Sequence, residues 1–368
     1  MKRLTRILAP IGAIAGAAIV STTGIARAQD APDPSTASIP ATICNSREDE
    51  TTSRFCPKLL PIPVFTVTNA DGSPIVTSVE LSDGSTQEIG GVFLNPNDAQ
   101  AFVSNLQENQ PELSDRVQVS VLTLAEIYEA DRANHIAHED PMEFAYVPSR
   151  EQLQQVRDIF AERNINVEGF DGVPLFFATS RADGGYLTIE QEGGAGGEFI
   201  PMYFDRASLD GLLALSGDEA LRGSIQYDVL SLERMLKTMQ VLDALEQLDA
   251  IVADPSSADL AATRIPDLPE MMVPEVLAIL SQGEDDPLAA AIAARLQDDS
   301  FEGESAIDRI EAFLDAEIQS LVESGTPSPI WQEIRSQLDL GLGQILDRIA
   351  FFPSQTSVQF IQELLQAP

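Results

Sequence analysis

The chain has 368 residues and a formal net charge of −36, with 58 acidic residues against 22 basic ones. A surface this acidic repels the phosphates of nucleic acids and anionic lipid headgroups, and no basic stripe with aromatic side chains interrupts it. Nucleic-acid binding is therefore excluded, and the length allows one large or two ordinary domains.

Residues 1–28 have the plan of a secretory signal peptide. Three basic residues precede an apolar segment at 7–20, and small residues then lead to Ala28. The apolar segment is shorter than the ~20 residues that a membrane-spanning helix needs. We expect cleavage before Gln29 and export of the remaining chain; an uncleaved membrane anchor is the alternative.

Residues 29–59 begin as a leader rich in Pro, Ala and Ser and contain the two cysteines of the chain, Cys44 and Cys56. In an exported chain, a close and even pair of cysteines predicts a disulfide. Two free thiols in a reducing cell are the alternative.

Two segments then repeat one pattern. PVFTVTNADGSPIVT from Pro63 and PLFFATSRADGGYLT from Pro174 each predict a hairpin, with an Asp-Gly turn between two strands. The parallel continues in VFLNPNDAQAF and MYFDRASLDGL, where Asn95 or Asp205 caps a helix after a strand. A further strand and helix follow in VQVSVLTLAEIY and IQYDVLSLERML, where the helix is capped by Thr123 or Ser231.

The order strand-strand-strand-helix-strand-helix thus occurs twice. It predicts an α/β domain at 60–253 with two pseudo-symmetric halves, about 60–148 and 165–253, that arose by internal duplication. The GGAGG sequence at 193–197 precedes a strand and not a helix, so we interpret it as a β–β connection rather than a phosphate-binding loop.

The chain offers little catalytic chemistry. Its two histidines, His135 and His138, precede Glu139 and Asp140 and could bind a transition metal. Their spacing differs from that of zinc peptidases, so a solvated connector is the preferred interpretation and metal binding stays open. With no nucleophile motif, we expect no enzyme activity and no cofactor.

Residues 254–368 are acidic and predict an all-helical C-terminal extension. An amphipathic helix at 305–323 places apolar residues on one face, and further helical patterns occupy 274–282, 286–297, 330–352 and 357–365. We expect a bundle that packs on itself or on the core and is removable as a unit. A partner-docking or oligomerisation arm is the alternative.

Five segments together resemble the Tic22-like family between about Leu60 and Ala253: IPVFTVTNADGSPIV, VFLNPNDAQAFVSNL, FAYVPSREQLQQV, GVPLFFATSRADGGYLTI and FIPMYFDRASLDGLL. That family comprises a chloroplast intermembrane-space import component and its cyanobacterial periplasmic relatives. The resemblance implies two related α/β halves and apolar clefts instead of a catalytic centre. It also implies escort of precursor proteins across the envelope and, in cyanobacteria, a link to outer-membrane assembly.

We therefore expect a periplasmic chaperone or transport factor that carries unfolded precursor or outer-membrane proteins in apolar grooves, with the thylakoid lumen as the alternative location. Outer-membrane assembly machinery is a second expected partner, and stable membrane insertion is not expected. The candidate groove residues are Phe102, Val103, Leu124, Ile127, Tyr128, Leu212, Leu213, Leu232, Met235 and Met239. A structural adaptor for a folded envelope component and an unrecognised hydrolase are the alternative functions.

Overall fold

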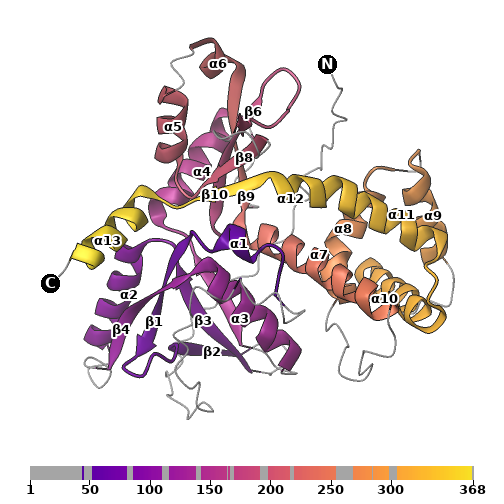
Figure 1. Ribbon diagram of the computed structural model, residues 1–368, viewed down its shortest axis with the longest axis horizontal. Helices are drawn as coiled ribbons and strands as arrows, with labels where there is room; N and C mark the ends of the chain where they lie inside the picture. Colours follow the sequence, from indigo (N-terminus) through magenta and orange to yellow (C-terminus); the bar gives the residue numbers. More distant parts are fainter. Residues whose placement is uncertain are drawn as a thin grey trace. The chain divides into compact units, whose positions relative to one another are not determined.

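The computed structural model describes residues 44, 52–80, 86–109, 116–137, 142–163, 165, 170–190, 198–215, 219–253, 268–283, 285–297 and 305–366 (Figure 1). The expected signal peptide, the GGAGG connection and His138 lie outside these residues, as does the side chain of His135. The described chain forms two compact units. One is Leu236–Arg348, and the other consists of the residues before and after it.

The first sheet lies in the second of these units and has five strands. They are β1 (Pro63–Asn69), β2 (Val76–Glu80), β3 (Thr86–Phe93), β4 (Val117–Thr123) and β5 (Glu143–Val147). Their order is β2-β3-β1-β4, and β5 pairs with β3 in parallel. The expected turn after β1 is confirmed, because Gly72 has a positive φ of 87° and Thr68 pairs with Pro74 across it.

Two helices of this half begin at the expected caps. They are α2 (Pro96–Asn109) and α3 (Leu124–Ala137). The side chain of Asn95 accepts a hydrogen bond from the Asn97 N–H at 2.9 Å. The Thr123 hydroxyl accepts one from the Glu126 N–H, and the Glu126 carboxylate accepts one from the Thr123 N–H, which completes the capping box.

The second sheet repeats the pairing of the first. Its strands are β6 (Pro174–Ser180), β7 (Ile189–Glu190), β8 (Glu198–Tyr203), β9 (Ile225–Ser231) and β10 (Ile349–Phe352). The order is β10-β8-β6-β9, with β7 also paired to β8 and β10 parallel to β8. The register repeats too: Phe176 faces Val229 as Phe65 faces Val121. A duplicated unit would produce this pattern, and the duplication itself stays an inference.

The helices of the second half are α5 (Arg206–Leu215), α6 (Glu219–Ser224) and α7 (Leu232–Ala253). Asp205 caps α5 as expected, and its carboxylate accepts a hydrogen bond from the Ser208 N–H at 2.7 Å. The same carboxylate also accepts one from the Gln355 N–H at 3.3 Å, at the start of the last helix of the chain.

The expectation of an all-helical C-terminal extension is wrong. Residues 349–352, which we included in a helical pattern, form β10 in the second sheet. Ile349 and Phe351 are buried while their neighbours are partly exposed, as the period of a strand requires. Pro353 disfavours the α region at Phe352, the residue before it, so a helix could not continue through this position.

Two helices are exchanged between the sheets, α4 (Arg150–Glu162) and α13 (Gln355–Gln366). The α4 helix follows β5 of the first sheet but packs on the second, where Ile159 and Phe160 join a core with Phe176. The α13 helix follows β10 of the second sheet and lies beside α2 of the first half (Figure 1). There Phe360 contacts the Phe65 ring edge-on at a centroid distance of 5.3 Å. Each half thus supplies a helix to the core of the other.

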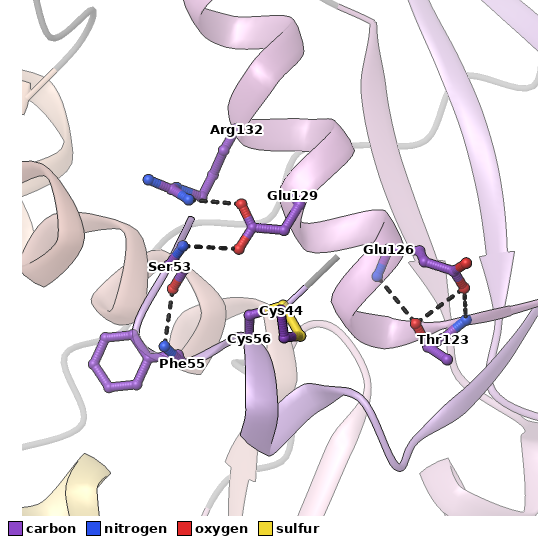
Figure 2. Close-up of a disulfide and its surroundings, with 8 residues drawn as sticks. All are labelled: Cys44, Ser53, Phe55, Cys56, Thr123, Glu126, Glu129 and Arg132. Atoms are coloured by element: carbon purple, nitrogen blue, oxygen red, sulfur yellow. Dashed lines mark hydrogen bonds and ion pairs between the residues drawn. A yellow bond between two sulfur atoms is a disulfide. The ribbon is translucent and has the colours of Figure 1, made fainter. Parts of the chain in front are cut away.

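The predicted disulfide is confirmed. Cys44 and Cys56 are bonded, and Cys56 begins the short helix α1 (Cys56–Leu59). Figure 2 shows how this segment is held on α3. The Glu129 carboxylate accepts a hydrogen bond from the Ser53 N–H at 3.0 Å and forms an ion pair with Arg132. Within α1, the Lys58 side chain donates a hydrogen bond to the Ile349 carbonyl of β10 at 3.0 Å.

The unit Leu236–Arg348 is helical. Besides the greater part of α7, it contains α8 (Leu268–Leu280), α9 (Pro287–Leu296), α10 (Ala306–Ser324), α11 (Pro329–Gln337), a π-helix (Leu338–Gly343) and α12 (Gln344–Arg348). The apolar face predicted for α10 is confirmed, because Ile310, Phe313 and Leu314 are buried. Among the described residues, no helix is both long and apolar enough to cross a membrane.

Candidate functional site: the apolar surface of the first sheet

The structure places most of the ten candidate groove residues inside the molecule. Seven side chains are at most 5% exposed: Leu124, Ile127, Tyr128, Leu213, Leu232, Met235 and Met239. These side chains form part of the core, so a client could reach them only if the fold opened. Val103 and Leu212 are partly exposed, and Phe102 is 40% exposed.

Phe102 lies on α2, at the edge of the core between α2, α13 and the first sheet. Its ring packs against Phe93 of β3 at a centroid distance of 5.5 Å. Val103 and Leu106 of the same helix are partly buried against this core. One side of Phe102 is therefore fixed, while the other is open to solvent.

The two exchanged helices start in the same way. Ser149 caps α4 and Ser354 caps α13, and each serine accepts a hydrogen bond from the N–H three residues later. The side chain of Gln152 then donates to the Phe204 carbonyl at 2.7 Å, and that of Ser357 donates to the Leu94 carbonyl at 2.8 Å. Their residues can therefore be compared position by position.

The comparison shows where the two halves differ. On α4, Ile159 and Phe160 are 0% and 6% exposed. The corresponding residues of α13, Leu364 and Leu365, are 50% and 81% exposed. The second sheet thus has an apolar helix that is buried to its last turn, whereas the last turn of the helix on the first sheet faces solvent.

Strand β4 is likewise more exposed than its counterpart β9 at one apolar position. Val121 is 37% exposed, although Val117 and Val119, which point to the same side of the strand, pack into the core. Its counterpart Val229 is partly buried against the core of the second sheet. We call Phe102, Val121, Leu364 and Leu365 the first-sheet apolar surface. Contiguous apolar patches mark interaction sites, whereas single exposed apolar side chains are normal on a protein surface, so a binding role for these four residues is a matter for proposal.

The sequence analysis included Phe102 among its candidate groove residues and did not include the other three residues of this surface. Leu364 and Leu365 were assigned to a separate extension, so nothing indicated that their helix returns to the first sheet. The matching cap serines and the repeated strand before each helix, β5 and β10, were the signal that could have found them.

A polar pocket of about 130 Å³ lies where the first turns of α2, α4, α5 and α13 meet. Glu151 and Asp205 line it, together with the capping side chains Asn95, Ser149 and Ser354. Because the caps already accept from the helix N–H groups, and because both charged residues are carboxylates, the pocket does not suit an anion. It serves as the junction of the exchanged helices.

Glu233, in the first turn of α7, is a partly buried carboxylate with a perturbed pKa. It accepts hydrogen bonds from the Val173 N–H and from the Ser231 hydroxyl. Burial raises the pKa of Glu233, and these hydrogen bonds counteract part of the increase. Gly172 has a φ of 91°, and a Cβ atom there would collide with the Glu233 carboxylate, so only glycine fits.

The residues of the first-sheet apolar surface include no side chain suited to catalysis or to metal binding. Within the described ranges, no group of three or more histidine, cysteine or acidic side chains is placed to hold a metal ion. The proposed His135 and His138 site lies outside the described side chains and stays untested.

Comparisons with known proteins agree with the resemblance noted in the sequence. A protein of Arabidopsis thaliana, described as Protein TIC 22, chloroplastic, is 25% identical over 206 residues, which are 55% of this chain and 69% of that protein. Among solved structures, Anabaena Tic22, described under protein transport, is 24% identical with a TM-score of 0.44, over 50% of this chain and 84% of that one. Tic22 from Plasmodium falciparum is 20% identical with a TM-score of 0.41, over 50% and 85%.

The sequence profile of the Tic22-like family matches residues 8–264, which is more than half of the chain. The chain therefore belongs to the Tic22-like family.

Proposed function

We propose that the protein is a periplasmic factor that escorts unfolded precursor proteins toward the outer membrane and holds them on the first-sheet apolar surface, without catalysis. The observation that carries the proposal is the difference between the exchanged helices. Leu364 and Leu365 of α13 are exposed, whereas the equivalent residues of α4, Ile159 and Phe160, are buried in the core of the second sheet. The apolar side chains of α13 are therefore available for contact with another molecule.

Physical chemistry supports this use of the surface. Burial of apolar area is non-directional, so one surface can accept client segments of different sequence. Complete burial of an exposed leucine contributes about 1.5–3 kcal/mol, and several such contacts give reversible binding. The net charge of −36 keeps a loaded complex in solution through self-repulsion. Binding is expected to depend little on salt and not at all on nucleotide.

Export is supported by two independent features. The sequence of residues 1–28 has the plan of a signal peptide. The Cys44–Cys56 disulfide, which ties the segment before the first strand to α1, is a bond that persists in oxidising compartments such as the periplasm.

The test uses two matched leucines. Leu365 near the end of α13 is 81% exposed, and Leu215 at the end of α5 is 87% exposed, but only the first belongs to the proposed surface. We expect Leu365→Glu to weaken the suppression of aggregation of a urea-unfolded outer-membrane protein about tenfold or more, because each bound client would have to bury a carboxylate. Leu215→Glu, which adds the same charge, is expected to suppress aggregation like the unmodified protein.

Thermal unfolding of both variants serves as the stability control, and light scattering gives the readout. Equal suppression by both variants would contradict the proposed surface. If the unmodified protein suppresses no aggregation but retains a folded envelope assembly component on a column, it is a structural adaptor and the escort function is wrong.

A further inference from the structure

The two sheets differ at one outer edge. The last strand on this side is β4 in the first sheet and its counterpart β9 in the second. Each of them pairs in antiparallel register with a single neighbour, β1 or β6. A strand at the edge of a sheet presents unpaired N–H and C=O groups, to which a further strand can be added.

The alternation of hydrogen bonds shows which groups of β4 point outward. Directly after this strand, the Leu124 N–H donates to the Ile62 carbonyl, on the side of β1. In an antiparallel pair, successive residues bond alternately to the neighbour and away from it. The even-numbered residues of β4 therefore bond to β1, and the N–H and C=O groups of Val119 and Val121 point away from it. Within the described part of the chain, no other strand pairs with these outward groups.

The same edge of β9 is occupied by two arginine side chains. By the same alternation the Ile225 carbonyl points away from β6, and it accepts a hydrogen bond from Arg181 Nε at 2.6 Å. Arg163, at the end of α4, forms an ion pair with Asp228 in the middle of β9. Because α4 packs on the side of the sheet that Val229 faces, Asp228 points to the opposite side. The Arg163 side chain must therefore pass along the outer edge of β9.

The first sheet has uncharged residues at two of these positions. In the register of the strands, Ser120 stands where β9 has Asp228. The two residues make corresponding contacts, since Ser120 shares a hydrogen bond with Thr68 at 2.7 Å and Asp228 accepts one from Thr179 at 3.1 Å. Ala70 follows β1 where an arginine follows β6, so no cation is placed there to bond to the edge.

The counterpart of Arg163 is uncharged as well. Counted from the cap residues Ser149 and Ser354, Arg163 of α4 corresponds to Pro368. Charged side chains at an edge strand hinder the addition of another strand. The sequence of β4, VQVSVLT, contains no charge, so its edge lacks the protection that β9 has.

The surroundings of β4 select the kind of strand that fits. On one side of the sheet an added strand would lie next to Val121, which is 37% exposed, and on the other side next to the polar residues Gln118 and Ser120. Alternating apolar and polar side chains would match both sides. A second copy of the chain is disfavoured, because two chains with a net charge of −36 repel each other, and acidic segments are disfavoured for the same reason.

We propose that the edge of β4 binds an extended client segment of alternating apolar and polar residues without acidic side chains, which adds to the first sheet as a further strand. The segment would pair with the outward groups of Val119 and Val121, and its apolar side chains would continue the first-sheet apolar surface. Such alternation is typical of the strands of membrane β-barrels. The inference rests on the proposed function, since it specifies the class of client segment that the first sheet holds.

Amide exchange tests the pairing directly. The full chain is labelled with nitrogen-15 valine, which reports Val119, Val121 and, as an internal control, Val229 of β9. The probe is a capped peptide in which valine alternates with threonine between terminal lysines. At saturation the peptide is expected to slow amide exchange at Val119 and Val121 about tenfold or more and to leave Val229 unchanged.

Two further peptides separate backbone pairing from side-chain contact. One carries N-methyl groups on its interior amides, so it keeps every side chain but cannot donate the hydrogen bonds of a strand. Its Kd, measured by fluorescence anisotropy, is expected to be about tenfold higher or more, because at least two hydrogen bonds are lost. The other peptide groups all its valines at one end and is expected to bind more weakly than the alternating one.

Ser120→Asp places on β4 the acidic residue of β9 without its arginine. It is expected to raise the Kd of the alternating peptide about tenfold, because pairing would bury a carboxylate. The fold should persist, since Thr68 can donate to an aspartate there as Thr179 does to Asp228. Ser78→Asp is the control, because Ser78 is exposed on β2 of the same sheet. Circular dichroism checks the fold of both variants.

Several results would overturn the inference. They are the absence of peptide binding, unchanged exchange at Val119 and Val121 with bound peptide, and equal binding of the N-methylated or the valine-grouped peptide. Protection of both valines that grows with the concentration of the protein alone would assign the edge to a second copy. If the alternating peptide does not bind but aggregation suppression still depends on Leu365, strand addition is wrong and the proposed function stands.

Discussion

At the scale of single residues, short-range hydrogen bonds determine where elements begin, and a few buried polar groups join elements that are distant in the sequence. Ser357 is such a group. Its hydroxyl, in the first turn of α13, donates to the carbonyl of Leu94, the residue after β3, and the side chain is 1% exposed. The bond fixes α13 to the first sheet.

Ser357→Ala leaves the Leu94 carbonyl buried without this donor. We expect a loss of about 1–3 kcal/mol in the free energy of unfolding, measured by urea denaturation. Thr356→Ala is the control, because Thr356 is exposed in the same turn. If both variants lose the same amount, helix propensity explains the effect and the buried bond does not.

Glu233 predicts a pH dependence. Because burial raises its pKa above the usual 4.5, the folded protein keeps this proton at pH values where the unfolded chain has released it. Unfolding then releases a proton, so this residue makes the protein less stable as the pH rises above 4.5 toward the pKa of the folded state.

Glu233→Gln cannot release that proton, so its free energy of unfolding is expected to increase relative to the unmodified protein as the pH rises through this window. Denaturation at a series of pH values measures the difference. Glu190→Gln removes the same charge from an exposed site and provides the control. A difference between Glu233→Gln and the unmodified protein that does not change with pH would refute this account.

Sequence reasoning succeeded at this scale wherever the cause was local. Thr123 and Glu126 are three residues apart, so their capping box could be predicted without the fold. The exposure of an apolar residue has no local cause. Met239 and Phe102 are equally apolar, yet one is 0% and the other 40% exposed, because the elements packed around them differ.

At the scale of elements, the exchange of α4 and α13 links the ends of the domain. The last strand and helix, residues 349–366, complete the second sheet and the core of the first. The sequence analysis did not predict β10, because a four-residue strand is too short to show the two-residue alternation of buried and exposed side chains within a pattern that otherwise predicts a helix. The exchange of α4 and α13 was not predicted either. An amphipathic pattern indicates that a helix packs on one face, but it does not indicate which sheet that face contacts.

A chain that ends at residue 253 tests this reading. It lacks β10 and α13, so Ile200 and Met202 lose their neighbouring strand and Phe65 loses Phe360. We expect it to be unfolded or to lack a cooperative transition in circular dichroism, in contrast to our initial expectation from the sequence. A cooperative transition with unchanged stability would show that residues 254–368 are removable as a unit.

At the scale of the whole molecule, the helical unit Leu236–Arg348 stands in the sequence of the second half where the first half has only a short connection. In the first half, residues 138–142 lead from α3 to β5, whereas in the second half the helical unit separates the start of α7 from β10. The two sheets and their exchanged helices should therefore form without it.

We expect a chain in which residues 237–348 are replaced by a copy of residues 129–142 to fold cooperatively. The copy supplies the rest of α3 and its connection, so the new helix has the surface of its counterpart. Circular dichroism and urea denaturation measure the result, and the chain that ends at residue 253 is the comparison. Failure of the shortened chain to fold would show that the sheets require the helical unit.

The most direct test of the proposed function is the site of client contact. A photoreactive amino acid is placed at Leu365 or at Leu215, and each protein is mixed with the same urea-unfolded outer-membrane protein and irradiated. Because both positions are exposed, the yield of crosslinks measures where the client lies and not how accessible the probe is. We predict a crosslink yield at position 365 several times that at position 215. Equal yields, or a higher yield at position 215, would contradict the claim that clients bind to the first-sheet apolar surface.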